Sequence, residues 1–179
     1  DAVTLAGTVP FDPDSDLNLK LESHGDALGF LTALGGDSLT VKQGSTDLRL
    51  LLSGPLRQPQ ANGFVVVTNG DLTIAEQELR RINTSILFDF DRLLVQHLEA
   101  EVGRGGKLRG SGTLGLFAPQ SDAEPLTLQL SQGQIQQSIV NFQADGEVQL
   151  SGALVQPVVS GDLTLSRGTL RPQSGLFGR

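Results

Sequence analysis

Hydrophobic and polar residues alternate along much of the chain, which is the pattern of a β-strand with one buried face. The clearest runs are 16–22, 98–102, 126–131, 147–151 and 162–166. In each run the apolar side chains share one face of the strand and the polar side chains share the other. The pattern predicts an all-β, mostly antiparallel structure with a dozen or more strands, each exposed to water on one side.

Residues that favour turns lie between these runs and predict where the strands end. They occur at 35–37, 62–63, 69–71, 105–106, 145–146 and 161–162, and most combine glycine with Asn or Asp. Segments 27–34 and 75–81 contain good helix formers, but both are too short for stable helices. We expect loops or strand ends in these two segments.

The chain contains an internal repeat. Segment 52–59 (LSGPLRQP) matches segment 150–157 (LSGALVQP) at six of eight positions, and the similarity continues at an offset of 98, giving repeats at 52–72 and 150–170. The opening of the repeat has shorter echoes around Gly7 and Gly112. Because glycine within a strand marks a bulge or bend, the repeat predicts a curved sheet. We expect one structural unit over residues 1–179.

The apolar face of such a sheet must be shielded from water by another apolar surface. A second sheet of the same chain, the hydrocarbon of a membrane and a bound apolar ligand are the alternatives. Membrane barrels carry belts of Tyr and Trp, and the chain has neither. A β-sandwich is the commonest arrangement, but sandwich cores usually include Trp, Tyr or Met, which are all absent. These absences favour an open trough occupied by lipid, a partner strand or another copy.

Composition excludes several classes of protein. The chain has 13 Lys and Arg, 20 Asp and Glu, and a net charge of −7, which disfavours binding to nucleic acid. With no cysteine, it can form neither disulfides nor zinc–thiolate sites. The longest apolar run, 64–67, is far shorter than the roughly 20 residues that span a bilayer as a helix. Since the chain starts at Asp1 and lacks Met, we expect a piece of a longer protein.

Two motifs resemble a nucleotide-binding site and a calcium-binding loop, but neither is complete. Segment 110–115 spells G-x-G-x-x-G, but the residues after it cannot open the helix that a nucleotide site requires. Asp12, Asp14 and Asp16 are spaced like the start of a calcium loop, yet Leu17 stands where that loop requires glycine. We predict no catalytic residue, no metal site and no cofactor.

The remaining polar candidates are few. His24 and His97 have no nucleophile motif beside them. Arg104, Lys107 and Arg109 form the one local basic cluster, which is either a solvated hairpin tip or a contact for lipid head groups.

Several of these segments together resemble a known family. The motif L-S-G-x-L-x-Q-P at 52–59 and 150–157, the glycine-and-leucine tail at 161–170 and the stretch 86–114 are similar to the C-terminal domain of TamB-type translocation and assembly proteins. The resemblance covers most of the chain. The family belongs to the AsmA-like bridge proteins, long periplasmic molecules anchored in the inner membrane, with a relative in the chloroplast envelope.

The resemblance implies a β-taco, an elongated antiparallel sheet folded into a trough with an apolar interior. It implies a periplasmic location, a parent protein anchored in the inner membrane and reaching the outer membrane, and a TamA-like outer-membrane barrel protein as partner. The implied function is a hydrophobic groove that binds phospholipid acyl chains during lipid transport between the two membranes, or assists outer-membrane protein assembly. The groove-lining positions carried over to this chain are Leu17, Leu19, Leu21, Leu48, Leu50, Leu52, Val65, Val67, Leu72, Ile74, Ile86, Phe88, Leu126, Leu128, Leu130, Leu163 and Leu165.

Two other functions remain open from the sequence. The first is a scaffold or chaperone for outer-membrane proteins that pairs a free strand edge with a partner sheet and carries no lipid. The second is a self-contained β-sandwich that acts as a binding module. The first alternative depends on backbone pairing, whereas the groove depends on apolar side chains. None of the three functions requires catalysis.

Overall fold

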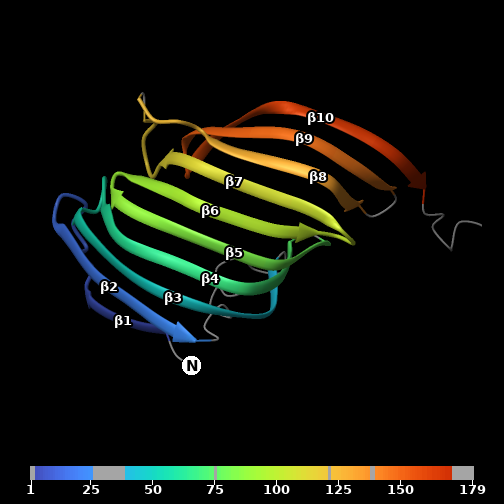
Figure 1. Ribbon diagram of the computed structural model, residues 1–179. Coiled ribbons are helices and arrows are strands. Elements are labelled where there is room, and N and C mark those ends of the chain that lie inside the picture. Colours follow the sequence, from blue (N-terminus) through green and yellow to red (C-terminus); the bar gives the residue numbers. More distant parts are fainter. Residues whose placement is uncertain (1–2, 26–38, 75, 121, 138–139, 171–179) are drawn as a thin grey trace, which may run out of the picture.

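The computed structural model describes residues 3–25, 39–74, 76–120, 122–137 and 140–170. These residues form one ten-stranded sheet in which the strands follow one another in chain order (Figure 1). Every neighbouring pair is antiparallel. The strands are β1 (Val3–Thr8), β2 (Asp16–Gly25), β3 (Leu39–Pro55), β4 (Gln60–Ile74), β5 (Gln77–Phe90), β6 (Arg92–Val102), β7 (Gly106–Gly115), β8 (Leu126–Gln137), β9 (Val140–Ala153) and β10 (Gln156–Leu170).

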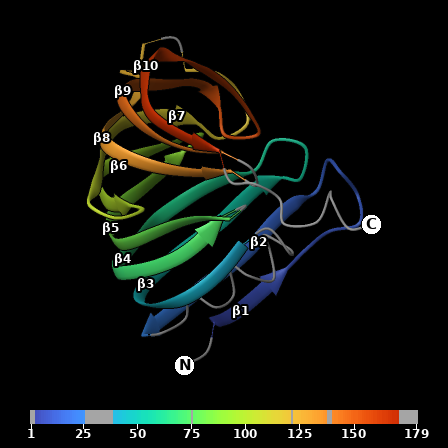
Figure 2. The same cartoon turned by 90° about the vertical axis from the view of Figure 1, so that its right-hand side faces the viewer.

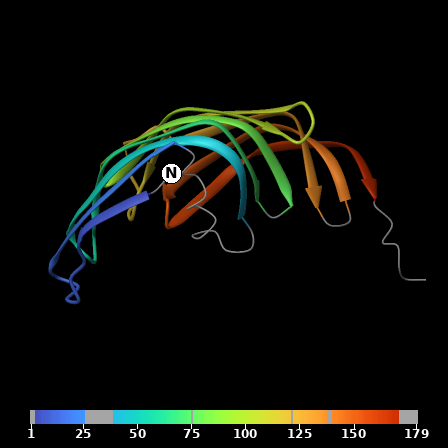
Figure 3. The ribbon, with the colours of Figure 1, turned by 90° about the horizontal axis from the view of Figure 1, so that it is seen from below.

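The sheet is open and strongly curved. Seen from below it forms an arch (Figure 3), and the turned view shows the strands as one continuous bent layer (Figure 2). Strands β1 and β10 are its two edges and do not pair with each other. The predicted all-β, curved antiparallel sheet is therefore confirmed. The alternative of a β-sandwich is wrong for the described residues, because they contain no second sheet.

Most of the predicted turns are wrong. The signals at 62–63, 69–71, 145–146 and 161–162 lie inside β4, β9 and β10, whereas 105–106 does lie at the turn between β6 and β7. Segments 27–34 and 35–37 lie outside the described residues, and β5 already begins at Gln77. Because strands continue through these glycines for up to 15 residues, the described part of the chain has ten strands and not a dozen or more.

The glycines inside the strands bend the sheet without ending the strands. Gly63 has a φ of 141°, which side chains rarely permit. A Cβ atom on Gly63 would lie 2.0 Å from the carbonyl oxygen of Arg49 on β3. Gly161 on β10 has a φ of 143° and would place a Cβ atom 2.2 Å from the carbonyl oxygen of Glu147. The absence of a side chain thus lets neighbouring backbones approach closely at a bend.

The sequence repeat is also a repeat of backbone geometry. The β3–β4 and β9–β10 hairpins share one register at the sequence offset of 98, and Gly63 and Gly161 occupy equivalent places in it. Further along, Asn69 and Arg167 both have a φ of 51° and both lie at a register shift. Each hairpin therefore contains the same bend followed by the same bulge.

Bulges keep the apolar side chains on one face of long strands. In β4, Val65 and Val67 occupy odd positions while Leu72 and Ile74 occupy even ones, and a register shift separates the two pairs. Register shifts also interrupt the pairing of β3, β5, β6, β8 and β10. Since one extra residue reverses the alternation of a strand, each bulge restores the face that the sequence would otherwise lose.

Aspartate side chains on neighbouring strands stabilise two of the bulges. The backbone N–H of Arg81 donates to Oδ1 of Asp71 at 2.8 Å, and the N–H of Gln132 donates to Oδ1 of Asp145 at 2.6 Å. Both donors belong to residues with positive φ. The carboxylates thus satisfy N–H groups of bulged residues with a charge-assisted hydrogen bond.

Substitution of Gly63 tests the role of the bend. We expect Gly63→Ala to lower the free energy of unfolding by about 2 kcal/mol or more, because the new methyl group meets a carbonyl oxygen and φ is positive. Gly168→Ala on β10 is the control, since a Cβ atom there meets nothing within 4 Å. Urea denaturation measures both variants, and equal midpoints for the two would contradict this account.

Candidate functional site

Register partners connect apolar side chains from strand to strand. Directly paired residues of antiparallel strands project to the same face of a sheet. Leu21 on β2 lies opposite Leu50 on β3, and Leu50 lies opposite Gly63 on β4. Gly63 lies opposite Phe88 on β5, and Phe88 lies opposite Leu93 on β6. We call the side of the sheet that carries this row the apolar face.

The same face continues through the second half of the sheet. Leu98 on β6 lies opposite Gly110 on β7, which lies opposite Leu128 on β8. Leu128 in turn lies opposite Val148 on β9, and Val148 lies opposite Gly161 on β10. The apolar face therefore extends across the sheet to β10.

The register and the bulges place all the predicted groove-lining residues on the apolar face. Leu17, Leu48 and Leu126 are buried. Ile74, Leu163 and Leu165 are 45%, 48% and 59% exposed. The remaining predicted residues are half-buried, namely Leu19, Leu21, Leu50, Leu52, Val65, Val67, Leu72, Ile86, Phe88, Leu128 and Leu130.

The tightest packing on the apolar face involves residues that the sequence analysis did not select. Its buried cluster comprises Ala61, Leu93, Val95, Leu114, Leu116 and Leu126, and only Leu126 was predicted. Residues 93–95 form a continuous apolar run, so alternation could not show which of them face inward. By contrast, Val148 and Leu150 alternate cleanly with polar neighbours, and this signal could have identified them.

At the end of the sheet where this cluster lies, β8 is missing between β7 and β9. Strand β8 begins only at Leu126, and beyond its start Gly115 on β7 forms a bridge with Ala153 on β9. The N–H of Leu154 donates to the carbonyl oxygen of Gly115 at 2.7 Å. Because β7 and β9 meet at this end, side chains from four strands converge there and bury one another.

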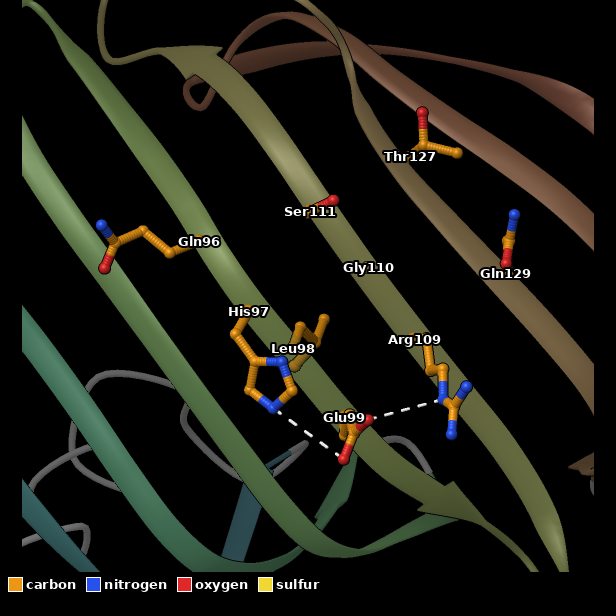
Figure 4. Close-up of a pocket in the computed structure, with 9 residues that line it drawn as sticks. All are labelled: Gln96, His97, Leu98, Glu99, Arg109, Gly110, Ser111, Thr127 and Gln129. Carbon is orange, nitrogen blue, oxygen red and sulfur yellow. Dashed lines mark ion pairs between the residues drawn. The ribbon is translucent and has the colours of Figure 1, made fainter.

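The opposite face of the sheet, which we call the polar face, is mainly polar but also carries Leu51, Leu87 and Leu94. A shallow cavity of about 260 Å³ lies there over β6, β7 and β8, and Figure 4 shows its lining residues. Glu99 lies between two side chains, 3.5 Å from Nε of Arg109 and 3.8 Å from Nε2 of His97. These side chains pair with one another along the strand surface, which leaves the polar face to interact with water.

The acidic segment before β2 forms a turn that satisfies its own backbone. Asp12 accepts hydrogen bonds from the N–H of Asp14 at 3.2 Å and from Oγ of Ser15 at 3.3 Å, and Asp14 pairs with Arg57 at 3.3 Å. Among the residues that the structure describes, no group of three or more His, Asp or Glu side chains is placed to hold a metal ion. The same residues include no helix long and apolar enough to cross a membrane.

An ion pair links two strands that are not neighbours. Nζ of Lys42 on β3 lies 2.5 Å from Oε1 of Glu78 on β5, so the pair crosses over β4. The hydrogen bond that the Lys42 ammonium donates to the Glu78 carboxylate lowers the pKa of Glu78 below its ordinary value of 4.5. On β2, a hydrogen bond from Lys20 likewise lowers the pKa of Glu22.

The comparisons with known proteins identify the class of this sheet. The chain matches the family model described as the TamB C-terminal domain over residues 1–171. The chain therefore belongs to the TamB family, and the predicted resemblance is confirmed. No solved structure gives a significant match.

Two similar curated proteins come from plants. "Protein TIC236, chloroplastic" of Arabidopsis thaliana is 26% identical over 130 residues, which is 70% of this chain and 6% of that protein. "Protein SUBSTANDARD STARCH GRAIN 4, chloroplastic" of Oryza sativa subsp. japonica is 29% identical over 132 residues, with the same 70% and 6% coverage. The chain thus spans about 6% of the length of these relatives.

Membership of the TamB family indicates an envelope-associated role.

Removal of Lys42 tests the ion pair across β4. We expect Lys42→Met to raise the pKa of Glu78 towards 4.5, whereas the pKa of Glu22 stays low as an internal control. A lowered carboxyl pKa stabilises the fold above pH 4.5, and this contribution is lost as the pH falls through the lowered pKa. NMR titration of the side-chain carboxyl groups measures both values. An unchanged Glu78 titration in Lys42→Met would show that the pair does not form.

Proposed function

We propose that this segment provides a hydrophobic groove for phospholipid acyl chains moving between the inner and outer membranes of a cell envelope. The observation that carries the proposal is the apolar face, which continues across the open sheet with no second layer over the described strands. In this proposal the segment lies in the periplasm as part of a longer protein anchored in the inner membrane. No catalytic step is involved.

Curvature supports this proposal. In a single curved sheet, side chains converge on the concave side and diverge on the convex side. The side chains with the least exposure, such as Leu48, Val95 and Ala144, lie on the apolar face, whereas Leu51, Leu87 and Leu94 on the polar face are exposed. We therefore infer that the apolar face is the concave side of the trough, where an acyl chain would be surrounded on three sides.

The character of the contacts also suits a moving acyl chain. Polar side chains on the apolar face are few, and Thr46 and Thr84 are examples. Contacts between hydrocarbon groups are individually weak, at about 0.1–0.2 kcal/mol per atom pair, and they have no preferred direction. A chain could therefore shift along the groove without breaking any hydrogen bond.

The exposed end of the groove offers a test that leaves the core intact. We expect Leu165→Asp to lower the amount of bound phospholipid by about ten-fold or more, because burial of a carboxylate against hydrocarbon is unfavourable. Leu165 is 59% exposed, so the variant should fold. Ser166→Asp places the same charge on the polar face of β10 and should bind lipid normally. Native mass spectrometry of the purified protein measures bound lipid.

Equal lipid binding by Leu165→Asp and Ser166→Asp would argue against the groove. A second comparison uses β3, where Leu50 lies on the apolar face and Leu51 on the polar face. We expect Leu50→Asp to bind less lipid than Leu51→Asp, and far-UV circular dichroism establishes that both variants remain folded.

A second candidate function is pairing of a free strand edge with a partner sheet, in a scaffold that assists outer-membrane protein assembly. Strand β10 is an edge of the sheet and has 15 residues, all exposed. It carries apolar residues in succession, including Val158, Val159 and Leu163. Natural sheets usually protect edges of this length and character. No other strand among the described residues pairs with the outer side of β10, which favours strand addition there. The proposed partner is a TamA-like outer-membrane barrel protein.

Proline substitution separates strand pairing from lipid binding. We expect Thr164→Pro to weaken partner binding by about ten-fold, because proline removes an N–H donor and disturbs the edge. Thr164→Val is the control, since it keeps the N–H group and favours strand structure. Surface plasmon resonance with a purified TamA-like protein measures the affinity. If Thr164→Pro bound that partner as well as Thr164→Val does, pairing through this edge would be excluded, whatever the result for lipid.

A further inference from the structure

The turn between β6 and β7 concentrates positive charge on a chain that is acidic overall. Arg80, Arg81, Arg104, Lys107 and Arg109 lie at or beside this turn, on β5, on β7 and in the turn between β6 and β7. The chain has a net charge of −7. We call these five residues the basic hairpin.

One buried carboxylate organises the basic hairpin. The Glu101 side chain is 11% exposed, lies 2.6 Å from Arg80 and also pairs with Arg81. Oε1 of Glu101 additionally accepts a hydrogen bond from the N–H of Gly105 at 3.2 Å. Glu101 therefore fixes both guanidinium groups and the backbone of the turn in place.

Two cations of the basic hairpin keep their full charge available. Arg109 pairs with Glu99 at 3.5 Å. Arg104 and Lys107, in contrast, form no ion pair with any residue that the structure describes. The carboxylates of Glu99 and Glu101 lie among these cations, and Asp71 and Glu78 lie beside Arg81 and Arg80. The unpaired positive charge of the site therefore lies on Arg104 and Lys107.

A cavity lies between these side chains. Its volume is about 350 Å³, and its lining includes Arg81, Lys107, Arg109 and Gly105 together with the carboxylates of Glu99 and Glu101. A Cβ atom on Gly105 would meet nothing within 4 Å, so the turn leaves open space for a ligand. Arginine forks and a lysine ammonium around such a space are suited to the oxygens of a phosphate group.

The hairpin also joins this charged site to the apolar face. Along β7, Leu108 lies between Lys107 and Arg109 and projects to the opposite side. Along β6, Ala100 and Val102 are buried on the apolar face. Cationic groups and hydrocarbon are therefore separated only by the thickness of one strand, which fits a ligand that is anionic at one end and apolar at the other.

The turns at the other ends of the strands have the opposite charge. They lie on the far side of the sheet from the β6–β7 turn (Figure 1). Their acidic residues are Asp12, Asp14, Asp16, Asp89, Asp91, Asp122 and Glu124, against Arg57 and Arg92. An anionic head group is therefore repelled from the acidic rim and attracted to the basic hairpin on the opposite side of the sheet.

We propose that the basic hairpin binds the phosphate group of a phospholipid whose acyl chains lie on the apolar face. This inference rests on the proposed groove function and adds the head-group class and the rim at which the head group binds. Lipids in the groove would then all be oriented with their phosphates towards the β6–β7 side.

The test compares two lipids with identical acyl chains, phosphatidic acid and diacylglycerol. We expect the unaltered protein to bind phosphatidic acid about ten-fold more tightly, a difference that one or two charge-assisted hydrogen bonds can produce. The double variant Arg104→Glu with Lys107→Glu should lose this preference and still bind diacylglycerol. The matched control, Arg57→Glu with Arg92→Glu, makes the same change in net charge at the acidic rim and should keep the preference.

The outcomes separate this inference from the groove proposal. If diacylglycerol binds and phosphatidic acid binds no more tightly, the head-group site is excluded and the groove proposal stands. If neither lipid binds, both fail. If inorganic phosphate alone binds as tightly as phosphatidic acid, the hairpin is a site for free phosphate and the lipid assignment is overturned. Equal loss of preference in the two double variants would assign the effect to net charge and not to the hairpin.

Discussion

The structure depends on one constraint, which is that apolar side chains of successive strands must project to the same face of a single sheet. Strict alternation cannot satisfy this over strands of up to 17 residues, because the apolar positions change parity within the strand. In β4 the change falls between Val67 and Leu72, where a bulge supplies the extra residue. The repeated bulge at Arg167 has the same position in the second hairpin. Without its bulge, such a strand would place about half of its apolar side chains on the opposite, solvent-exposed face of the sheet.

The bends at glycine give this sheet its shape, and the shape explains how one layer can be stable. Gly63 and Gly161 allow adjacent backbones to approach where any side chain would collide with a carbonyl oxygen. The curvature that results lets side chains of β4, β6, β7 and β8 cover one another in the absence of a second layer. Towards β10 this mutual cover is lost, and the strand is exposed along its whole length. The same architecture therefore produces a packed cluster at one place and accessible apolar surface at another.

The charged residues make the two rims of the sheet different from each other. The strands alternate in direction, so the turns fall on two opposite rims, and the acidic and basic residues of the chain divide unequally between them. Glu101 holds Arg80 and Arg81 at one rim, while the Asp12 turn and its neighbours occupy the other. Membership of the TamB family indicates an envelope-associated role. In the proposed function, the acidic rim and the basic hairpin on the opposite side would orient an amphipathic molecule on the apolar face.

The sequence by itself determined the fold class and the face of the sheet on which most leucines lie, because alternation with a period of two is a local property that needs no knowledge of distant residues. It also located the repeat and the bends that accompany it. Only the tertiary structure decided that Gly63, Gly146 and Gly161 lie within strands, since a glycine with positive φ serves a turn and a bend equally well. Pairing with β5 and β7 likewise decided that Leu93 and Val95, within a continuous apolar run, join the core. The charged cavity beside Glu101 also required the fold, because its cations come from β5 and β7, two strands that no local sequence pattern brings together.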